Sequence, residues 1–342
     1  MRRGRAAEAA MRSKSEDYRG DPSRARLGSR PFMAGVAHYM AWSEPYLLES
    51  TIRENARKLY FFADELREMK RAGRVRTTDP RHMGPGDIEA FLVWMKRRGL
   101  SQSTKRKYLQ ILDGYLSAWG NRVVGDMRAR HEFDHAFKGA KAEVSFIEEE
   151  DLRRIFRCVD EWPGYEGIML RGCFALLFGV AARPKEVVSA LVEDVDLDGG
   201  AFYIRHPKGE GSWGVREWVP IVRGDMLERV RRFVAERAAY LQSIGRDSPY
   251  LFANTGRGAP YTTNALRLWK AKVEAKTGIS FALKEFRSSF ATITYAHAPE
   301  MKGAISKQLR HSKEGTTEQY YIAYDKKRAA ERLRDEWKKS EI

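Results

Sequence analysis

The residues with the clearest chemical potential lie near the end of the chain, in the stretch QLRHSKEGTTEQYYIAYDKK at residues 308–327. His311 is followed nine residues later by Tyr320, and Tyr321 stands directly behind it. A pair of tyrosines in an apolar core is common and indicates no chemistry. In this polar and basic context, at a fixed distance from a histidine, a tyrosine is instead a candidate nucleophile.

Basic residues that suit the same chemistry, together with one glutamate, stand in three earlier segments. GVAARPKEVVSALVEDVDL carries Arg183 and Glu186, the glycine-rich turn of RHPKGEGSWGVREWVPI carries Lys208, and LKEFRSSFATITYA carries Lys284 and Arg287. Each signal is weak alone, and a lysine in a hairpin turn is usually only solvated. Lys284 and Arg287 are three residues apart, so they are predicted to project from one face of a helix.

Together these residue types describe a site that handles a phosphodiester. Two arginines can grip the non-bridging oxygens through their forked guanidinium groups. A lysine on a hairpin can protonate a leaving 5′-oxygen, and a histidine can hydrogen-bond the phosphate or help to move a proton. A phenol has a pKa of about 10, and nearby guanidinium charge favours its reactive phenolate. Because cations can do the work of Mg²⁺ here, the sequence predicts neither a metal nor a cofactor.

The charge of the chain points to nucleic acid as its partner. The 342 residues contain 62 Lys and Arg against 46 Asp and Glu, which gives a net charge of +16. Cationic side chains displace condensed counterions from phosphates, so a surplus of this size favours binding to nucleic acid. A basic surface that serves solubility alone is the alternative.

Cysteine usage and hydropathy predict a soluble intracellular protein. Cys158 and Cys173 form no CxxC pair and fall in apolar helical patterns, so they are predicted to be buried thiols in a reducing compartment. The N-terminal residues lack the apolar run of a signal peptide, and no apolar stretch is long enough to span a bilayer. A cytoplasmic location without membrane contact is expected, with the protein on the nucleoid when it is bound to DNA.

The hydrophobic pattern divides the chain into segments. Residues 1–30 are basic with few large apolar side chains and are predicted to be a flexible arm. Residues 31–122 are predicted to form a small four-helix domain, and residues 123–145 a polar linker. Residues 146–324 are predicted to be mainly helical with one small antiparallel sheet, and residues 325–342 to form a charged amphipathic helix.

A basic helix is predicted within the four-helix domain, in SQSTKRKYLQILDGYLSAWG. Ser101 is its expected N-cap, and an apolar face begins at Tyr108. Lys105, Arg106 and Lys107 form a cationic patch near its start. These three residues are therefore candidate DNA contacts.

A competing signal is the stretch HEFDH, which begins at His131 and ends at His135. Two histidines four residues apart on a helix, with a glutamate between them, can bind zinc. The flanks DMRAR and AFKGAKAE are polar and basic, and no third ligand is evident. A solvated interdomain segment is therefore the preferred interpretation.

The order of these residues resembles the signature of the tyrosine recombinases, or phage integrase family. ARPKEVVSALVEDVDL is similar to the first arginine box of the family, KEFRSSFAT to its second, and QLRHSKEGTTEQYY to its last histidine box, with Tyr320 at the usual spacing. Lys208 matches the hairpin lysine. LSQSTKRKYLQILDGYLSAW is similar to the closing helix of the family's core-binding domain, so the resemblance covers about residues 31–330.

Two positions depart from the family pattern. Lys284 stands where histidine is usual, which resembles some archaeal viral and plasmid integrases and leaves water or the phosphate itself to take the proton of Tyr320. Arg310 stands where glycine is commoner, which adds charge near the site with little expected effect.

The resemblance implies a two-domain clamp on duplex DNA, with a helical core-binding domain and an α+β catalytic domain. It implies that an integrase of a mobile element cleaves and rejoins attachment sites through a 3′-phosphotyrosine formed by Tyr320. In this mechanism Arg183 and Arg287 stabilise the transition state, Lys208 is the general acid, Lys284 and His311 assist at the phosphate, and Glu186 orients Arg183. Exchange between two sites implies a homotetramer on DNA, with residues 325–342 docked on a neighbouring protomer rather than on their own domain.

Two other functions fit the same residues. A type IB topoisomerase uses nearly the same set but relaxes DNA without choosing a sequence, and the core-binding domain argues against it. The second alternative is a non-catalytic DNA-binding regulator on the same scaffold, which the complete set of catalytic residue types disfavours. The sequence identifies neither the attachment site nor a directionality factor.

Overall fold

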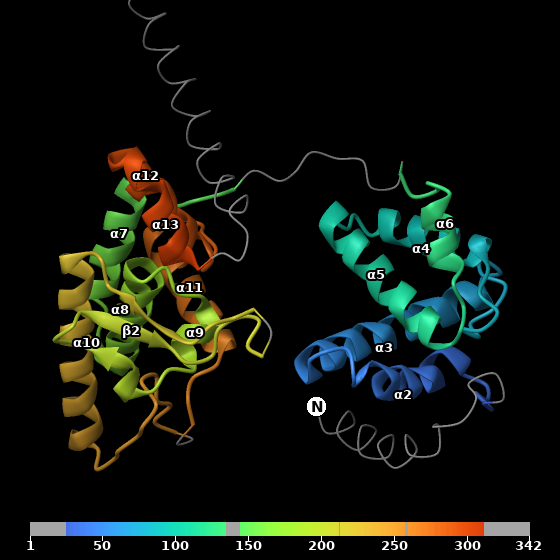
Figure 1. The fold of residues 1–342 in the computed structure, drawn as a ribbon. Coiled ribbons are helices and arrows are strands. Elements are labelled where there is room, and N and C mark those ends of the chain that lie inside the picture. Colours follow the sequence, from blue (N-terminus) through green and yellow to red (C-terminus); the bar gives the residue numbers. More distant parts are fainter. Residues whose placement is uncertain (1–24, 135–143, 212, 257–258, 311–342) are drawn as a thin grey trace, which may run out of the picture. The chain divides into compact units, whose positions relative to one another are not determined.

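The computed structural model describes residues 25–134, 144–211, 213–256 and 259–310 (Figure 1). The chain divides into two compact units, residues 1–141 and 142–342. In the described ranges, no helix is both long and apolar enough to cross a membrane.

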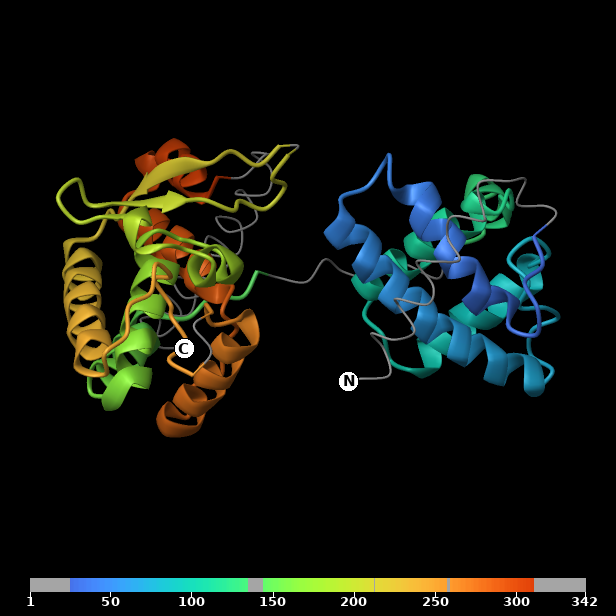
Figure 2. The ribbon, with the colours of Figure 1, turned by 90° about the horizontal axis from the view of Figure 1, so that it is seen from below.

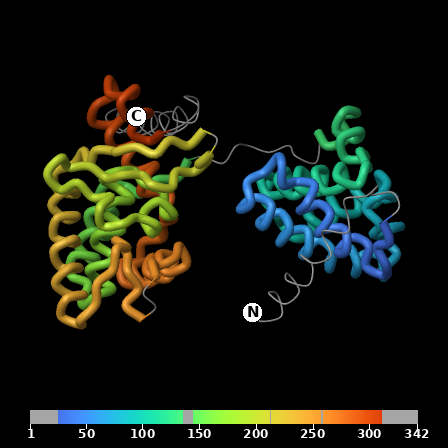
Figure 3. Tube along the Cα trace, turned by 60° about the horizontal axis from the view of Figure 1, so that its bottom comes forward, coloured from blue at the N-terminus to red at the C-terminus, as the bar shows by residue number. Residues whose placement is uncertain are grey.

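The described part of the first unit is built from helices packed around one core (Figure 3). They are α2 (Pro31–Ser43), α3 (Glu49–Arg71), α4 (Pro85–Arg97), α5 (Gln102–Ala118) and α6 (Val123–Ala129). Helix α3 turns an apolar stripe to this core, in which Leu59, Phe62 and Leu66 are fully buried. Leu48 precedes this stripe in the sequence but is half exposed, since it is the N-cap of α3 and lies outside the helix.

Helix α5 begins where the sequence predicts. The hydroxyl of Ser101 accepts a hydrogen bond from the backbone N–H of Thr104 at 3.3 Å, which satisfies one of the free donors at the helix start. Further along, the hydroxyl of Tyr115 donates to the carbonyl of Phe32 at 2.6 Å. This buried bond ties α5 to α2 and makes α5 a rigid support for its basic first turns.

Two parts of the first unit differ from their prediction. Residues 123–129, expected to be linker, form α6 and bury Val124 and Met127 in the core. Two apolar residues three positions apart are too short a pattern to stand out in a polar segment, although they suffice to anchor one helical turn. At the other end, residues 25–30 are not a free arm, because Leu27 is buried and the carbonyl of Ala25 accepts a bond from Arg81 at 3.0 Å.

The second unit is mainly helical with a small antiparallel sheet of strand order β1-β2-β3, which confirms the predicted fold class. Phe202 of β2 pairs with Val219 of β3. In order, its elements are α7 (Glu149–Asp160), α8 (Gly164–Gly179), α9 (Pro184–Val188), η3 (Val192–Asp194), β1 (Val195–Asp196), β2 (Ala201–Ile204), β3 (Glu217–Pro220), α10 (Gly224–Ser243), α11 (Thr263–Thr277), α12 (Glu285–His297), η4 (Pro299–Met301) and α13 (Lys302–Leu309).

Helix α8 is the centre of the second unit, as its all-round apolar sequence predicts. Helices α7, α10 and α12 pack around it, and the sheet lies at one side of this helical layer (Figure 2). Cys158 and Cys173 are buried free thiols, as predicted. Burial raises the pKa of the Cys173 thiol, so this thiol is unreactive and serves only to pack the core.

The contact between α8 and α10 leaves no room for a side chain at Gly172. A Cβ added there would lie 2.3 Å from the ring of Phe233, which is itself fully buried. We expect Gly172→Ala to lower the free energy of unfolding by about 1–3 kcal/mol, because overpacking outweighs the gain in helix propensity.

Urea unfolding followed by circular dichroism measures this change. Gly303→Ala is the matched control, since Gly303 lies in α13 with open space around it and should be neutral or slightly stabilising. Equal stability of the two variants would contradict a rigid α8–α10 contact.

Candidate active site

A strained turn after α8 brings the two predicted arginines together. The chain passes through Ala181 with a φ of 53°, a conformation that costs a residue with a Cβ free energy, and then places Arg183 at the N-cap of α9. The buried guanidinium of Arg287, on α12, donates from Nη1 to the carbonyl of Ala181 at 2.7 Å. One short turn therefore positions both arginines, although they are distant in sequence.

Glu186 is the buried carboxylate of this site. Its Oε1 accepts from Nη1 of Arg183, and its Oε2 accepts from the backbone N–H of Arg183, both at 2.8 Å. The same Oε2 accepts from Nη2 of Arg310 at 2.8 Å. Burial acts to raise the pKa of Glu186, but the charges of Arg310 and Arg183 and the backbone hydrogen bond outweigh it and lower the pKa. The carboxylate is thus ionised and fixes the orientation of Arg183.

Lys208 lies exposed in the turn between β2 and β3, as the sequence predicts. It lines a cavity of about 190 Å³ together with Arg183 and Arg310. Trp213, which is half exposed, closes another side of this cavity. Three cations from three separate segments therefore face one hollow of a size that suits a phosphate group.

The two residues of the second box differ in exposure. Lys284 is the N-cap of α12 with a helical backbone conformation and an exposed side chain, whereas Arg287, three residues later, is buried. Spacing alone does not indicate which of two basic residues is buried. The structure therefore leaves Lys284 at the surface and turns Arg287 inward.

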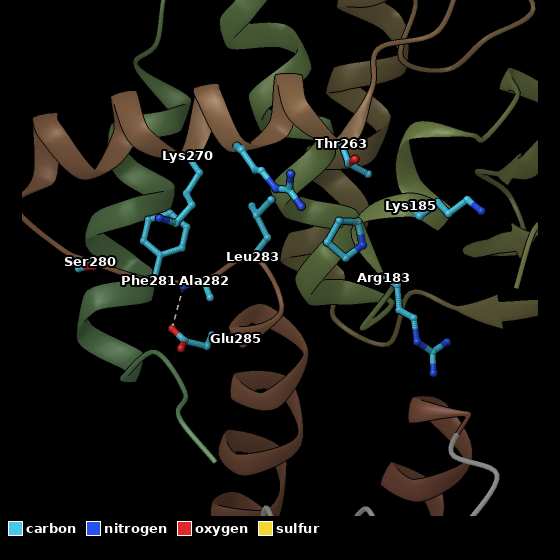
Figure 4. Close-up of a pocket in the computed structure, with 11 residues that line it drawn as sticks. Arg183, Lys185, Thr263, Lys270, Ser280, Phe281, Ala282, Leu283 and Glu285 are labelled. Carbon is cyan, nitrogen blue, oxygen red and sulfur yellow. Dashed lines mark hydrogen bonds between the residues drawn. The ribbon is translucent and has the colours of Figure 1, made fainter. Parts of the chain in front are cut away.

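A second hollow of about 730 Å³ adjoins the arginine turn (Figure 4). Arg183 and Lys185 line one side, and Arg267 and Lys270 of α11 line another. Glu285 also lines the hollow, but its carboxylate is engaged by the backbone N–H of Ala282 at 2.9 Å and by the hydroxyl of Ser145 at 2.6 Å. Glu285 stays charged and Lys270 is paired with Glu274 at 2.6 Å, but the cations that line the hollow still outnumber its carboxylate.

The sequence analysis did not identify the residues of α11 that line this hollow. Thr263, Arg267 and Lys270 follow one another at spacings of four and three, which places them on one face of a helix. That spacing was a usable signal. It stood out poorly because basic residues are common throughout this chain.

The last predicted box reaches the edge of the described residues. Arg310, at the end of α13, contacts Glu186. His311, Tyr320 and Tyr321 lie outside the described residues, so their predicted roles stay predictions.

In the first unit, the predicted basic patch lies on the first turns of α5. Arg106 and Lys107 are exposed and Lys105 is partly buried, while Leu109 and Leu112 on the opposite face enter the core. The patch is thus presented at the surface by a helix that its own core holds in place.

The described part of HEFDH does not form the helix that the zinc-binding interpretation requires. Helix α6 ends at Ala129, and His131 follows in a turn with a φ of 60°. The His131 ring lies 3.3 Å from the carboxylate of Asp134. His135 lies outside the described residues. Residues 131–134 therefore lack the helical geometry that the zinc motif requires.

Comparison with known proteins settles the family. The profile described as "Phage integrase family" matches residues 145–328, more than half of the chain. The chain belongs to this family. This integrase-family chain carries the arginine turn, Lys208 and the second box within the matched region, and its predicted class, a tyrosine-type site-specific DNA recombinase, is confirmed.

Curated relatives of this integrase-family chain are tyrosine recombinases. It is 23% identical over 269 residues to the tyrosine recombinase XerA of Thermococcus kodakarensis, an alignment that covers 68% of this chain and 89% of the relative. It is 23% identical over 238 residues to the tyrosine recombinase XerC of Listeria monocytogenes, covering 68% of this chain and 76% of the relative.

Solved structures share its fold. The XerH site-specific recombinase bound to a palindromic difH substrate has a TM-score of 0.60 at 15% identity, covering 86% of this chain and 94% of that one. The Tn1549 transposon integrase in complex with transposon right end DNA has a TM-score of 0.60 at 13% identity, covering 84% and 94%. A lambda integrase dimer bound to a core site has a TM-score of 0.57 at 16% identity, covering 83% and 92%.

Proposed function

We propose that this protein integrates and excises a mobile genetic element by cleaving and rejoining duplex DNA through a 3′-phosphotyrosine. The observation that carries the proposal is the grouping of Arg183, Lys208 and Arg310 around one cavity, with Arg183 held by the ionised carboxylate of Glu186. Arg287 is bonded to the turn that leads into Arg183. Cations held at fixed positions before the reaction are what a phosphoryl transfer needs, because charge accumulates on the non-bridging oxygens in its transition state.

The proposed chemistry assigns one role to each residue. Tyr320 gives its proton to water or to the phosphate itself and attacks the scissile phosphorus, and the bond from phosphorus to the 5′-oxygen breaks. Arg183 and Arg287 stabilise the negative charge that develops on phosphorus, and Lys208 protonates the departing 5′-oxygen. Lys284 and His311 contact the phosphate and assist proton movement, and Glu186 orients Arg183. Attack by a 5′-hydroxyl of the partner duplex on the phosphotyrosine rejoins the strands and releases Tyr320.

Duplex DNA is the proposed partner of both units. The cationic hollow beside α11 shares Arg183 with the smaller cavity, so a DNA backbone could run from one to the other with neighbouring phosphates in each. The first unit acts as the core-binding domain, with Lys105, Arg106 and Lys107 at DNA, and the second unit acts as the catalytic domain. Solved relatives of the same fold are bound to DNA, which supports this partner.

Strand exchange between two sites calls for four active tyrosines, one for each strand that is cut. We therefore propose a homotetramer assembled on two attachment sites. In that assembly residues 325–342 dock on a neighbouring protomer, and the chain between Ala129 of α6 and Glu149 of α7 connects the two domains.

Covalent selection of DNA sites tests the proposed function. The full chain is incubated with a library of nicked duplexes that contain a randomised segment, and DNA that stays attached to protein after denaturation is sequenced. We expect two inverted half-sites around a short spacer, because a symmetric assembly reads a symmetric site.

The other outcomes are equally decisive. Covalent capture without any sequence preference would indicate a topoisomerase of type IB. Sequence-specific binding without a covalent product would indicate a non-catalytic regulator. Recombination between two plasmid copies of the selected site then separates an integrase from an enzyme that only cleaves.

A further inference from the structure

We propose that Arg310 is a positioning residue of the phosphate site. It forms an ion pair with Glu186, so that this carboxylate does not neutralise Arg183 and Arg183 can still attract the DNA phosphate. This inference rests on the proposed function, because it concerns the same phosphate. It gives Arg310 a larger part than the sequence suggested, where this residue only added charge nearby.

The fold places Arg310 at the site with little freedom. Helix α13 ends at Leu309, and the side chain of Gln308 donates to the carbonyl of Pro220 at 2.8 Å, which fastens this end of the helix to the end of β3. Arg310 follows with its side chain only 9% exposed and Nη2 at 2.8 Å from Oε2 of Glu186. The side chain of Glu186 is 2% exposed. Both partners are thus largely withdrawn from water, where charges act on one another strongly.

The balance of charge explains why a third residue is needed. Glu186 alone would cancel the charge of Arg183, the guanidinium it orients. With Arg310 on the same carboxylate, the group of three keeps a net charge of +1. The carboxylate can then hold Arg183 in place without removing its attraction for a phosphate.

The conformation of Arg310 argues against a purely structural role. Its φ of 51° and ψ of 47° are left-handed, a region that strains a side chain with a Cβ and that glycine adopts freely. A sequence that needed only the end of a helix here would be more stable with glycine. The arginine is therefore kept at the expense of backbone strain.

The hydrogen bonds of Arg310 also differ from those of a structural arginine. Buried Arg237 donates to the backbone carbonyls of Ser248, Tyr250 and Leu251 and so fastens a loop. Arg310 instead has Nε and Nη1 buried without a hydrogen-bond partner in the described part of the chain, and it lines the same cavity as Arg183 and Lys208. Among the described residues, the carboxylate of Glu186 is therefore the partner that holds the Arg310 side chain, as a residue acting through Glu186 requires.

A charge-compensation experiment tests the inference. The rate of covalent adduct formation is measured with a selected nicked duplex for wild type, Arg310→Gly, Glu186→Gln and the double variant. We expect Arg310→Gly to be slower by about tenfold to a hundredfold at unchanged DNA affinity, because Glu186 then neutralises Arg183. Glycine suits the left-handed backbone, so a loss of rate is not a consequence of strain.

The double variant gives the decisive readout. Removing the carboxylate charge restores the positive charge of Arg183. The amide of Glu186→Gln has a single oxygen, which can accept from Nη1 or from the backbone N–H of Arg183 but not from both, so the rescue should be partial. We expect the double variant to react at least about fivefold faster than Arg310→Gly. A double variant that is as slow as Arg310→Gly, or slower, would overturn the inference, since both a structural role and a direct phosphate contact predict no rescue.

Two controls complete the design. Arg310→Lys keeps a cation beside Glu186 and should stay close to wild type, whereas Lys307→Ala removes an exposed cation from α13 and should change the rate little. Loss of rate in Lys307→Ala equal to that in Arg310→Gly would reduce the effect to overall charge and sink the idea. Absence of any adduct with wild type would refute the proposed function instead, which keeps the two failures apart.

Discussion

Replacing Tyr320 with phenylalanine is expected to abolish the covalent protein–DNA adduct, a loss of more than about a thousandfold in adduct formation. The change removes one oxygen, the atom that attacks phosphorus, and keeps the ring, so the variant should fold and bind its site as wild type does. A nicked attachment-site duplex traps the adduct, because the short 5′ strand diffuses away and religation cannot occur. Denaturing electrophoresis of the trapped product is the measurement.

Tyr321→Phe is the matched control for this prediction. It deletes the same atom one residue further along, where the spacing from His311 is ten rather than nine, and it should leave the adduct in place. Loss of the adduct in Tyr321→Phe alone would keep the chemistry and move the nucleophile by one residue. An adduct that survives in both variants would refute the assignment of this stretch altogether.

Much of the second unit could be predicted from the sequence because its signals are local. Helix α8 is apolar on all sides, and such a segment has nowhere stable to lie except in the middle of a unit. The glycine-rich turn around Lys208 separates two alternating segments, which is the pattern of a hairpin. The candidate active site could be predicted from the residue types at Arg183, Arg287 and Lys208, because few reactions need those cations together with a tyrosine.

The remaining features depend on contacts that no local pattern encodes. Helix α6 exists because Val124 and Met127 find a core built by other helices. The left-handed conformation of Arg310 and its bond to Glu186 follow from the way α13 packs beside the arginine turn. Spacing likewise gave no hint that Lys284 would cap α12 while Arg287 would reach the carbonyl of Ala181. Pattern predicts elements and candidate residues, whereas burial and partners decide what each residue can do.

Lys208→Ala is expected to slow cleavage of ordinary DNA by about a hundredfold to ten-thousandfold, which is the usual contribution of a general acid. The reason lies in the leaving group: an alkoxide is nearly as basic as hydroxide, whose conjugate acid has a pKa of about 15.7, so it departs slowly without a proton. Since Lys208 is exposed in a turn, its removal should leave the fold intact. The rate of adduct formation under single-turnover conditions measures the loss.

A substrate with sulfur in place of the bridging 5′-oxygen isolates the proton transfer. A thiol ionises near a pKa of about 8.5, so a thiolate leaves without help, and Lys208→Ala should cleave this substrate almost as fast as wild type. Like Lys208→Ala, Lys208→Arg should cleave ordinary DNA slowly and the sulfur substrate almost as fast as wild type, because a guanidinium keeps the charge but gives up its proton poorly. Arg216→Ala removes an exposed cation from the same hairpin and should be near wild type on both. If sulfur fails to rescue Lys208→Ala, the lysine acts by holding the phosphate or the hairpin, and the proton must come from elsewhere in the site.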